Sequence, residues 1–179
     1  YVIRGGSKQY VEKLITPFSE RIFTEAPVER VIRYPDYVEV RINGQQSQKF
    51  DQVIMATHSD QALSLIADPS ALEQQVLGAI PYQSNEAVLH TDSSVLPRAK
   101  RAWAAWNYHL LNENNGHVPV TYNMNLLQGI RAPVEFCVTL NNSAAIDATK
   151  VIKRVTYHHP VFTPESVQAQ ARQRDINGV

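Results

Sequence analysis

The side chains of this chain best suited to binding chemistry are in two segments, WAAWNYH and VTYNMN. In an extended strand successive side chains point to opposite faces, so Trp106 and Tyr108 would share one face, and Asn107 and His109 the other. Each face would then carry side chains of one kind, either apolar or polar. Such a strand presents an apolar wall on one side and hydrogen-bonding groups on the other.

The segment VTYNMN repeats this division, with Tyr122 on the apolar side and Asn123 on the polar side. Two polar strand faces in an otherwise apolar sheet could line a ligand cavity with a few hydrogen-bonding groups. Alternatively, the polar face is simply the one that meets water. Tyr122 would pack in a core, so Tyr122→Ala should cost about 3–5 kcal/mol, whereas Asn123→Ala should cost little stability.

Other chemistries find less support. The seven glycines do not fit the G-x-G-x-x-G spacing of a dinucleotide fingerprint, although Gly5-Gly6-Ser7 at a helix start would suit either an anion or an ordinary capped turn. The six histidines include no pair at the i, i+4 spacing of helical metal ligands, so we expect no metal site. No G-x-S-x-G elbow exposes a nucleophile for hydrolysis.

Composition narrows the class of partner. Seventeen basic residues balance seventeen acidic ones without a run of like charge, which argues against nucleic acid or a polybasic membrane patch. The single cysteine, Cys137, lies in the apolar run VEFCVTL and is expected to be a buried structural thiol in a reducing compartment. We find no apolar segment of membrane-spanning length and no signal peptide, and expect a cytoplasmic protein.

These side chains need elements to position them, and the most distinctive is the segment FDQVIMATHSDQAL. Residues 53–55 are uniformly apolar and predict a strand buried on both faces. Ala56 and Thr57 would end this strand, and Ser59 or Asp60 would cap the following helix.

The residues before this segment, 1–50, predict several short elements. A strand at 1–4, a helix at 7–19, a strand at 22–25 and a meander of strands at 28–34, 37–42 and 47–50 are expected. Asn43-Gly44 is the strongest hairpin signal of the meander.

The second part is mostly strand. After a helix from about 70 to 78, strands are expected at 83–92, 104–111, 118–127, 134–141 and 150–158, with a last helix after Thr163. Strands joined without long helices pair antiparallel, so the fold class is α+β.

Eight stretches together resemble the flavin-containing amine oxidase superfamily. They are GGSKQYVEKL, EAPVERV, FDQVIMATHSDQAL, AWNYH, VTYNMN, LLQ, VTLN and YHHPVFT. More narrowly, they are similar to its bacterial branch of predicted NAD/FAD-binding proteins, or FAD-dependent amine oxidoreductases. The resemblance covers nearly the whole chain.

The resemblance implies roles for individual residues. Val28 would hold the adenine of FAD through its backbone, and Ala56 and Thr57 would lie near the phosphates, although His58 departs from the usual glycine or proline. The resemblance also implies which residues face the substrate, namely Trp106, Tyr108, Tyr122 and Asn123. The lysine that many amine oxidases place near the flavin has no counterpart that can be assigned, so the catalytic residues stay unknown.

The resemblance also implies an organisation and a range of substrates. Residues 1–67 would be a partial FAD-binding portion and residues 68–179 a substrate-domain portion, with the glycine fingerprint before Tyr1 and a flavin-contacting segment after Val179. We expect the isolated piece not to hold FAD and to form dimers or domain-swapped pairs through the apolar edge at 53–55. The substrate would be a small amine or an acyl lipid, and a non-enzymatic module for an apolar ligand is the rival interpretation.

Overall fold

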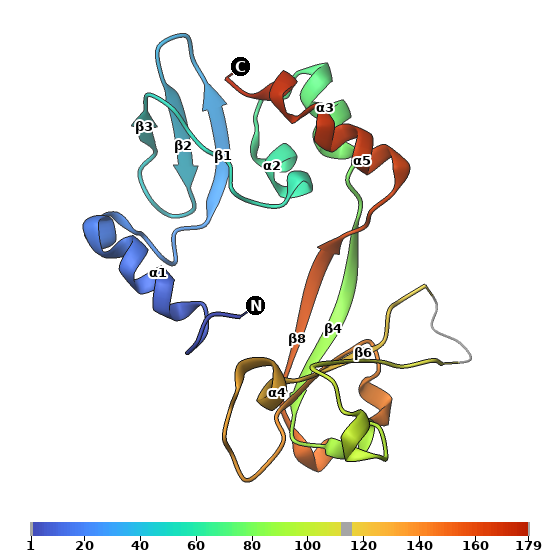
Figure 1. The fold of residues 1–179 in the computed structure, drawn as a ribbon. Coiled ribbons are helices and arrows are strands. Elements are labelled where there is room, and N and C mark those ends of the chain that lie inside the picture. Colours follow the sequence, from blue (N-terminus) through green and yellow to red (C-terminus); the bar gives the residue numbers. More distant parts are fainter. Residues whose placement is uncertain (1, 112–115, 179) are drawn as a thin grey trace. The chain divides into compact units, whose positions relative to one another are not determined.

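The computed structural model describes residues 2–111 and 116–178. The chain divides into two compact units, one formed by Glu20–Gln83 with Pro160–Val179 and the other by Tyr1–Ser19 with Ser84–His159. Helices and antiparallel sheets together confirm the predicted α+β class (Figure 1). The division into an FAD-binding portion at 1–67 and a substrate-domain portion at 68–179 stays a prediction.

The predicted meander is the sheet of the first of these units. It consists of β1 (Val28–Arg33), β2 (Val38–Ile42) and β3 (Gln48–Phe50), which pair antiparallel in that order. Val31 and Val40 are opposite each other and both are buried, so the alternation seen in the sequence forms the packed face. Gly44 turns between β2 and β3 at φ +69°, which confirms the predicted hairpin.

Three predicted helices complete this unit, and Figure 1 shows them near one another. They are α2 (Ser59–Leu65), α3 (Ala71–Gly78) and α5 (Pro164–Ala171), followed by a short 3₁₀ helix at Gln173–Ile176. Ser70 and Glu73 form a reciprocal capping box at the start of α3. Glu73 also binds β1, because its carboxylate accepts from Arg33 at 2.8 and 3.1 Å.

The predicted cap of α2 is wrong. His58 occupies the N-cap position, and neither Ser59 nor Asp60 does. The Ser59 amide donates instead to the Tyr82 hydroxyl at 2.8 Å, and the His58 ring stacks on Tyr82. A tyrosine distant in sequence therefore satisfies the amide that a local cap would have served.

Three predicted strands are not strands among the residues that the model describes. Residues 53–55 are irregular with Ile54 92% exposed, and 2–4 and 22–25 are likewise outside any sheet. An apolar run makes a strand only when a neighbour supplies hydrogen bonds, and within the described ranges none does so here. The strand expected to be buried on both faces is thus an exposed connection leading into α2.

The predicted helix at 7–19 is interrupted. Helix α1 (Lys8–Ile15) gives way to a 3₁₀ segment at Thr16–Arg21, with a kink at Phe18. Ser7 is at the N-cap position as predicted, without a side-chain capping bond.

The sheet of the other unit confirms the predicted antiparallel half. Its strands are β4 (Tyr82–His90), β5 (Trp106–Tyr108), β6 (Val120–Asn123), β7 (Cys137–Leu140) and β8 (Val151–Pro160), in the order β5-β6-β7-β4-β8. Short 3₁₀ helices at Ser93–Val95, Lys100–Ala102, Ser143–Ala145 and Ala148–Lys150 join them. The strands β4 and β8 are both long and lie next to each other in the sheet (Figure 1).

The strand predicted at 118–127 is too long. Its second half is a short helix, α4 (Met124–Gln128), which Asn123 caps by accepting from the Leu126 amide at 3.1 Å. Gly129 ends this helix at φ +66°. The local capping chemistry of Asn123 therefore overrides the continuing apolar alternation.

Within residues 2–111 and 116–178, no helix combines the length and apolar character needed to cross a bilayer.

Candidate functional site: a two-sided sheet

The five-stranded sheet has one polar and one apolar face, as the sequence predicts, and the polar face is the more deeply buried of the two. Pairing places Trp106 opposite Tyr122, and Tyr122 opposite Val138. Trp106 is 65% exposed and Tyr108 55%, while Tyr122 is half-buried. The apolar face is thus exposed at its edge strand, whereas Val120 and Ala87 on the same face are buried.

The apolar face is continuous across four strands. Its two rows, read from the pairing, are Trp106, Tyr122, Val138 and Leu89, and Tyr108, Val120, Leu140 and Ala87. No position in either row is charged. The Trp106 and Tyr122 rings meet edge to face with centroids 5.3 Å apart, a favourable aromatic geometry. This face can offer an apolar ligand a preformed surface.

The polar face is the buried one, so it is not simply the side of the sheet that meets water. It comprises Asn107, Thr121, Asn123, Thr139 and His90 together with Val88 and Cys137, all at most 8% exposed. Buried polar groups are costly unless they are hydrogen-bonded. The predicted substrate contact of Asn123 stays untested, but its side chain is engaged within the chain, with Leu126 and with Glu135 at 3.1 Å.

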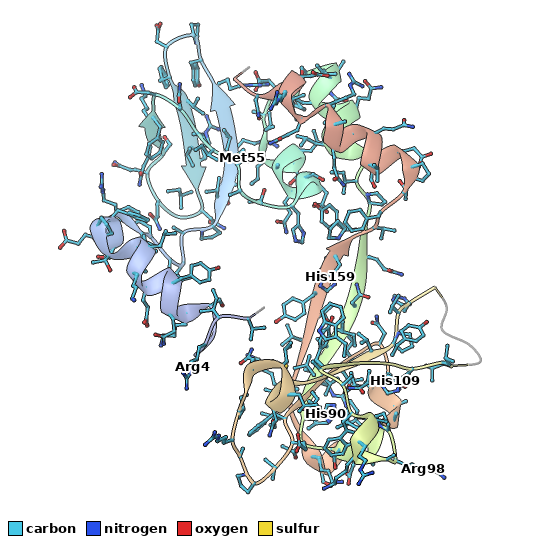
Figure 2. All side chains as sticks on the ribbon, viewed as in Figure 1. Arg4, Met55, His90, Arg98, His109 and His159 are labelled. Carbon is cyan, nitrogen blue, oxygen red and sulfur yellow. The ribbon has the colours of Figure 1, made fainter. Side chains whose placement is uncertain are left out.

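A chain of hydrogen bonds crosses the polar face through His90, Thr139, Thr121 and His109 (His90 and His109 are labelled in Figure 2). The His90 Nε2–Thr139 Oγ1, Thr139 Oγ1–Thr121 Oγ1 and Thr121 Oγ1–His109 Nε2 distances are 2.8, 2.8 and 2.7 Å. Burial lowers the pKa of both histidines, because the charged imidazolium is poorly solvated there. Burial therefore favours the neutral form of both rings.

One end of this chain lies beside a buried carboxylate, that of Asp92. Burial raises its pKa, but donors from the Asp147 and Ser94 amides and from Lys150 outweigh burial and hold the pKa well below the ordinary value. The Asp92 amide donates to His90 Nδ1 at 3.1 Å. Asp92 thus ties the loop after β4 to the segment before β8.

The three predicted cofactor residues are in the unit that contains the meander. Val28 begins β1 beside a register shift and is 37% exposed. Ala56 and Thr57 are exposed in the connection before α2. The exposed Val28 and the small, exposed residues of the connection leave room for a dinucleotide. Their contacts with FAD stay predictions.

Sequence reasoning missed His90, Asp92 and Thr139. His90 and Asp92 follow an apolar run at the end of β4, and Thr139 lies inside VTLN, so each looked like an ordinary strand or turn residue. The period-two pattern could have found Thr139, which shares a parity with Cys137. Among the described residues, no group of three His, Cys, Asp or Glu side chains could hold a metal ion.

Known proteins are similar to this chain in sequence pattern and in fold. The model of the family described as flavin containing amine oxidoreductase matches residues 1–127. No curated protein sequence matches the chain.

Two solved structures share the fold at low sequence identity. A CLA-producing fatty acid isomerase from P. acnes superposes with a TM-score of 0.59 at 14% identity, covering 87% of this chain and 40% of its own. Cyclohexylamine oxidase from Brevibacterium oxydans IH-35A gives 0.53 at 12% identity, covering 86% and 38%. The chain thus spans about 40% of the length of these proteins. With the family pattern extending over the meander, α2, α3, β4, β5 and β6, the chain belongs to the flavin-containing amine oxidoreductase family.

Proposed function

We propose that this chain is part of an FAD-dependent oxidoreductase in which a hydride passes from a substrate carbon to the flavin. One observation carries the proposal: the family pattern spans both the meander that begins at Val28 and the strands that bear Trp106 and Tyr122. The same chain therefore supplies elements suited to the cofactor and to an apolar substrate.

The residues have distinct tasks in this proposal. The Val28 backbone would bind adenine, and Ala56 and Thr57 would allow the phosphates to approach closely. FAD, when bound, supplies the hydride acceptor. The apolar sheet face would position the substrate and exclude water, which strengthens electrostatic interactions around the reacting atoms. The single cysteine of the chain, Cys137, is buried and unpaired, which suits a reducing compartment. The proposal therefore includes a cytoplasmic location.

An acyl-chain substrate is the second candidate, with desaturation or isomerisation as the reaction. The observation that favours it is the absence of charge at the eight paired positions of the apolar face. A flat uncharged wall would accommodate a hydrocarbon chain, and it offers an amine no counter-charge at those positions. A non-enzymatic module for an apolar ligand would use the same wall without flavin.

The decisive experiment uses the whole protein that carries this chain. We expect it to be yellow, with a flavin absorbance that bleaches anaerobically on adding an amine or an acyl substrate. Trp106→Ala should slow bleaching at unchanged flavin content, whereas Phe162→Ala, which removes another exposed ring that lies outside the sheet, should not. A colourless protein that still binds apolar ligands would establish the non-enzymatic module instead.

A further inference from the structure

Tyr82, the first residue of β4, contacts the start of helix α2 through both its hydroxyl and its ring. The Ser59 amide donates to the Tyr82 hydroxyl at 2.8 Å, and the Ser59 hydroxyl lies 3.3 Å from the same oxygen. The Tyr82 ring stacks on the His58 ring with centroids 4.5 Å apart and an interplanar angle of 14°. One side chain that is 23 positions away in sequence thus holds two consecutive residues.

These contacts replace the local capping bond that α2 lacks. His58 is the N-cap residue, and its side chain makes no capping bond. The first amides of a helix have no partner within the helix, and a partly buried amide without an acceptor costs free energy. Because the Tyr82 hydroxyl accepts from the first amide of α2, the backbone at Ser59 is fixed relative to β4.

The peptide that precedes Ser59 is held as well. The His58 carbonyl accepts from the Ala62 amide at 2.8 Å and from the Thr57 hydroxyl at 3.1 Å. Ala56 and Thr57, which come directly before it, are exposed. The connection into α2 therefore presents two accessible residues on a segment whose end is anchored by hydrogen bonds and by the ring of Tyr82.

The other end of α2 is bound to strand β1. The Ser64 carbonyl accepts from the Arg30 guanidinium at 3.2 Å, and the Ala67 amide donates to the Val31 carbonyl at 2.9 Å. Helix α2 is thus fixed at both ends, by β1 at its C-terminal end and by Tyr82 at its start. All of these residues are in the same compact unit. The placement of the connection relative to β1 therefore depends on both anchors.

We propose that Tyr82 is a positioning residue for the cofactor, which holds the connection so that Ala56 and Thr57 meet the phosphates of FAD while Val28 binds the adenine. This inference rests on the proposed function, which places FAD at these three residues. A connection that is already ordered loses less free energy when a large flexible dinucleotide binds. Tyr82 itself touches no cofactor atom in this proposal and acts through the Ser59 amide and the stacked ring.

Titration of FAD into the apoprotein of the whole enzyme, followed by flavin fluorescence, tests this role. Tyr82→Phe keeps the ring and removes the hydroxyl, so it should weaken FAD binding by roughly threefold to tenfold, as expected for one lost hydrogen bond. Tyr37→Phe is the control, because Tyr37 is also stacked on another ring in the same unit, and it should bind FAD as the wild-type protein does. Unchanged affinity in Tyr82→Phe, or an equal loss in both variants, would overturn the proposal.

Hydrogen exchange provides a readout that a merely structural role would not move. The Ser59 amide should exchange slowly in the wild-type protein and rapidly in Tyr82→Phe, while the amides of β1 and β2 keep their protection. Protection that falls throughout the unit would show a general loss of stability and would count against positioning. Equal exchange of the Ser59 amide in both proteins would also contradict the role of the hydroxyl.

The wild-type titration distinguishes the failure of this inference from the failure of the proposed function. A wild-type protein that binds no FAD overturns the proposed function, and the positioning role falls with it. A wild-type protein that binds FAD no more tightly than Tyr82→Phe overturns the positioning role alone.

Discussion

Thr121 and Thr139 face each other across β6 and β7 with their hydroxyl oxygens 2.8 Å apart, and neither side chain is exposed. Each hydroxyl also binds a histidine, Thr121 binding His109 and Thr139 binding His90. The interior of this sheet is therefore held by a polar chain in which each of the two threonine hydroxyls has two hydrogen-bond partners.

Thr139→Val should destabilise the protein by about 1–3 kcal/mol, because it leaves the His90 Nε2–H without an acceptor in a buried site. The shape of the side chain is kept, so packing changes little. Urea unfolding measures the loss. Thr156→Val, at an exposed position on β8, is the control and should be near neutral. Equal stabilities of both variants would show that the chain contributes nothing.

Asn123→Ala should cost about 1–3 kcal/mol, contrary to the small effect expected from sequence. The side chain is fully buried and caps α4, so its removal leaves the Leu126 amide without that partner. Asn123→Ser retains an oxygen that can cap and should recover part of the loss in a denaturant melt. If Asn123→Ala melts like the wild-type protein, the capping bond is unimportant.

Asp92 should make stability depend on acid. Its pKa in the folded protein lies below that in the unfolded chain, so its contribution is present above about pH 4 and is lost as the pH falls further. Asp92→Asn should cost about 1.5–3 kcal/mol at neutral pH and progressively less in acid. Unfolding free energies across this pH range provide the measurement. The exposed Asp36→Asn is the matched control, and a pH-independent effect of Asp92→Asn would contradict the assignment.

Cys137 should be inert in the folded protein. Its thiol is fully buried, and burial followed by the nearby Glu135 and Asp92 carboxylates raises its pKa to about 11. Only the thiolate reacts with disulfide reagents. A chromogenic thiol reagent at mildly alkaline pH should label Cys137 only after denaturant is added. Rapid labelling of the native protein would show that β7 opens.

The apolar connection at 53–55 should promote self-association of this chain when it is produced alone. Ile54 is 92% exposed, and exposed apolar segments recruit other chains. Light scattering should show dimers that Ile54→Lys disperses. Leu110→Lys, at a similarly exposed leucine in the other unit, should leave them intact. A monomer at high concentration would contradict this prediction.

Sequence alone predicted the elements whose signals are local. The Asn43-Gly44 hairpin, the helix after Ser70 and the helix after Thr163 are all present, because turn and capping preferences depend on a few neighbouring residues. Period-two alternation likewise assigned Trp106 and Tyr108 to one side of their strand and Asn107 to the other.

What alternation cannot decide is which side is buried. The polar side of β5 and β6 is the buried one because polar residues on neighbouring strands, Thr139 and His90, satisfy it, and these partners lie far away in sequence. The apolar residues 53–55, in contrast, form no buried strand, since no neighbouring strand within the described ranges pairs with them. Pattern therefore determined the two faces of each strand, whereas burial depended on long-range hydrogen bonding, which only the tertiary structure supplies.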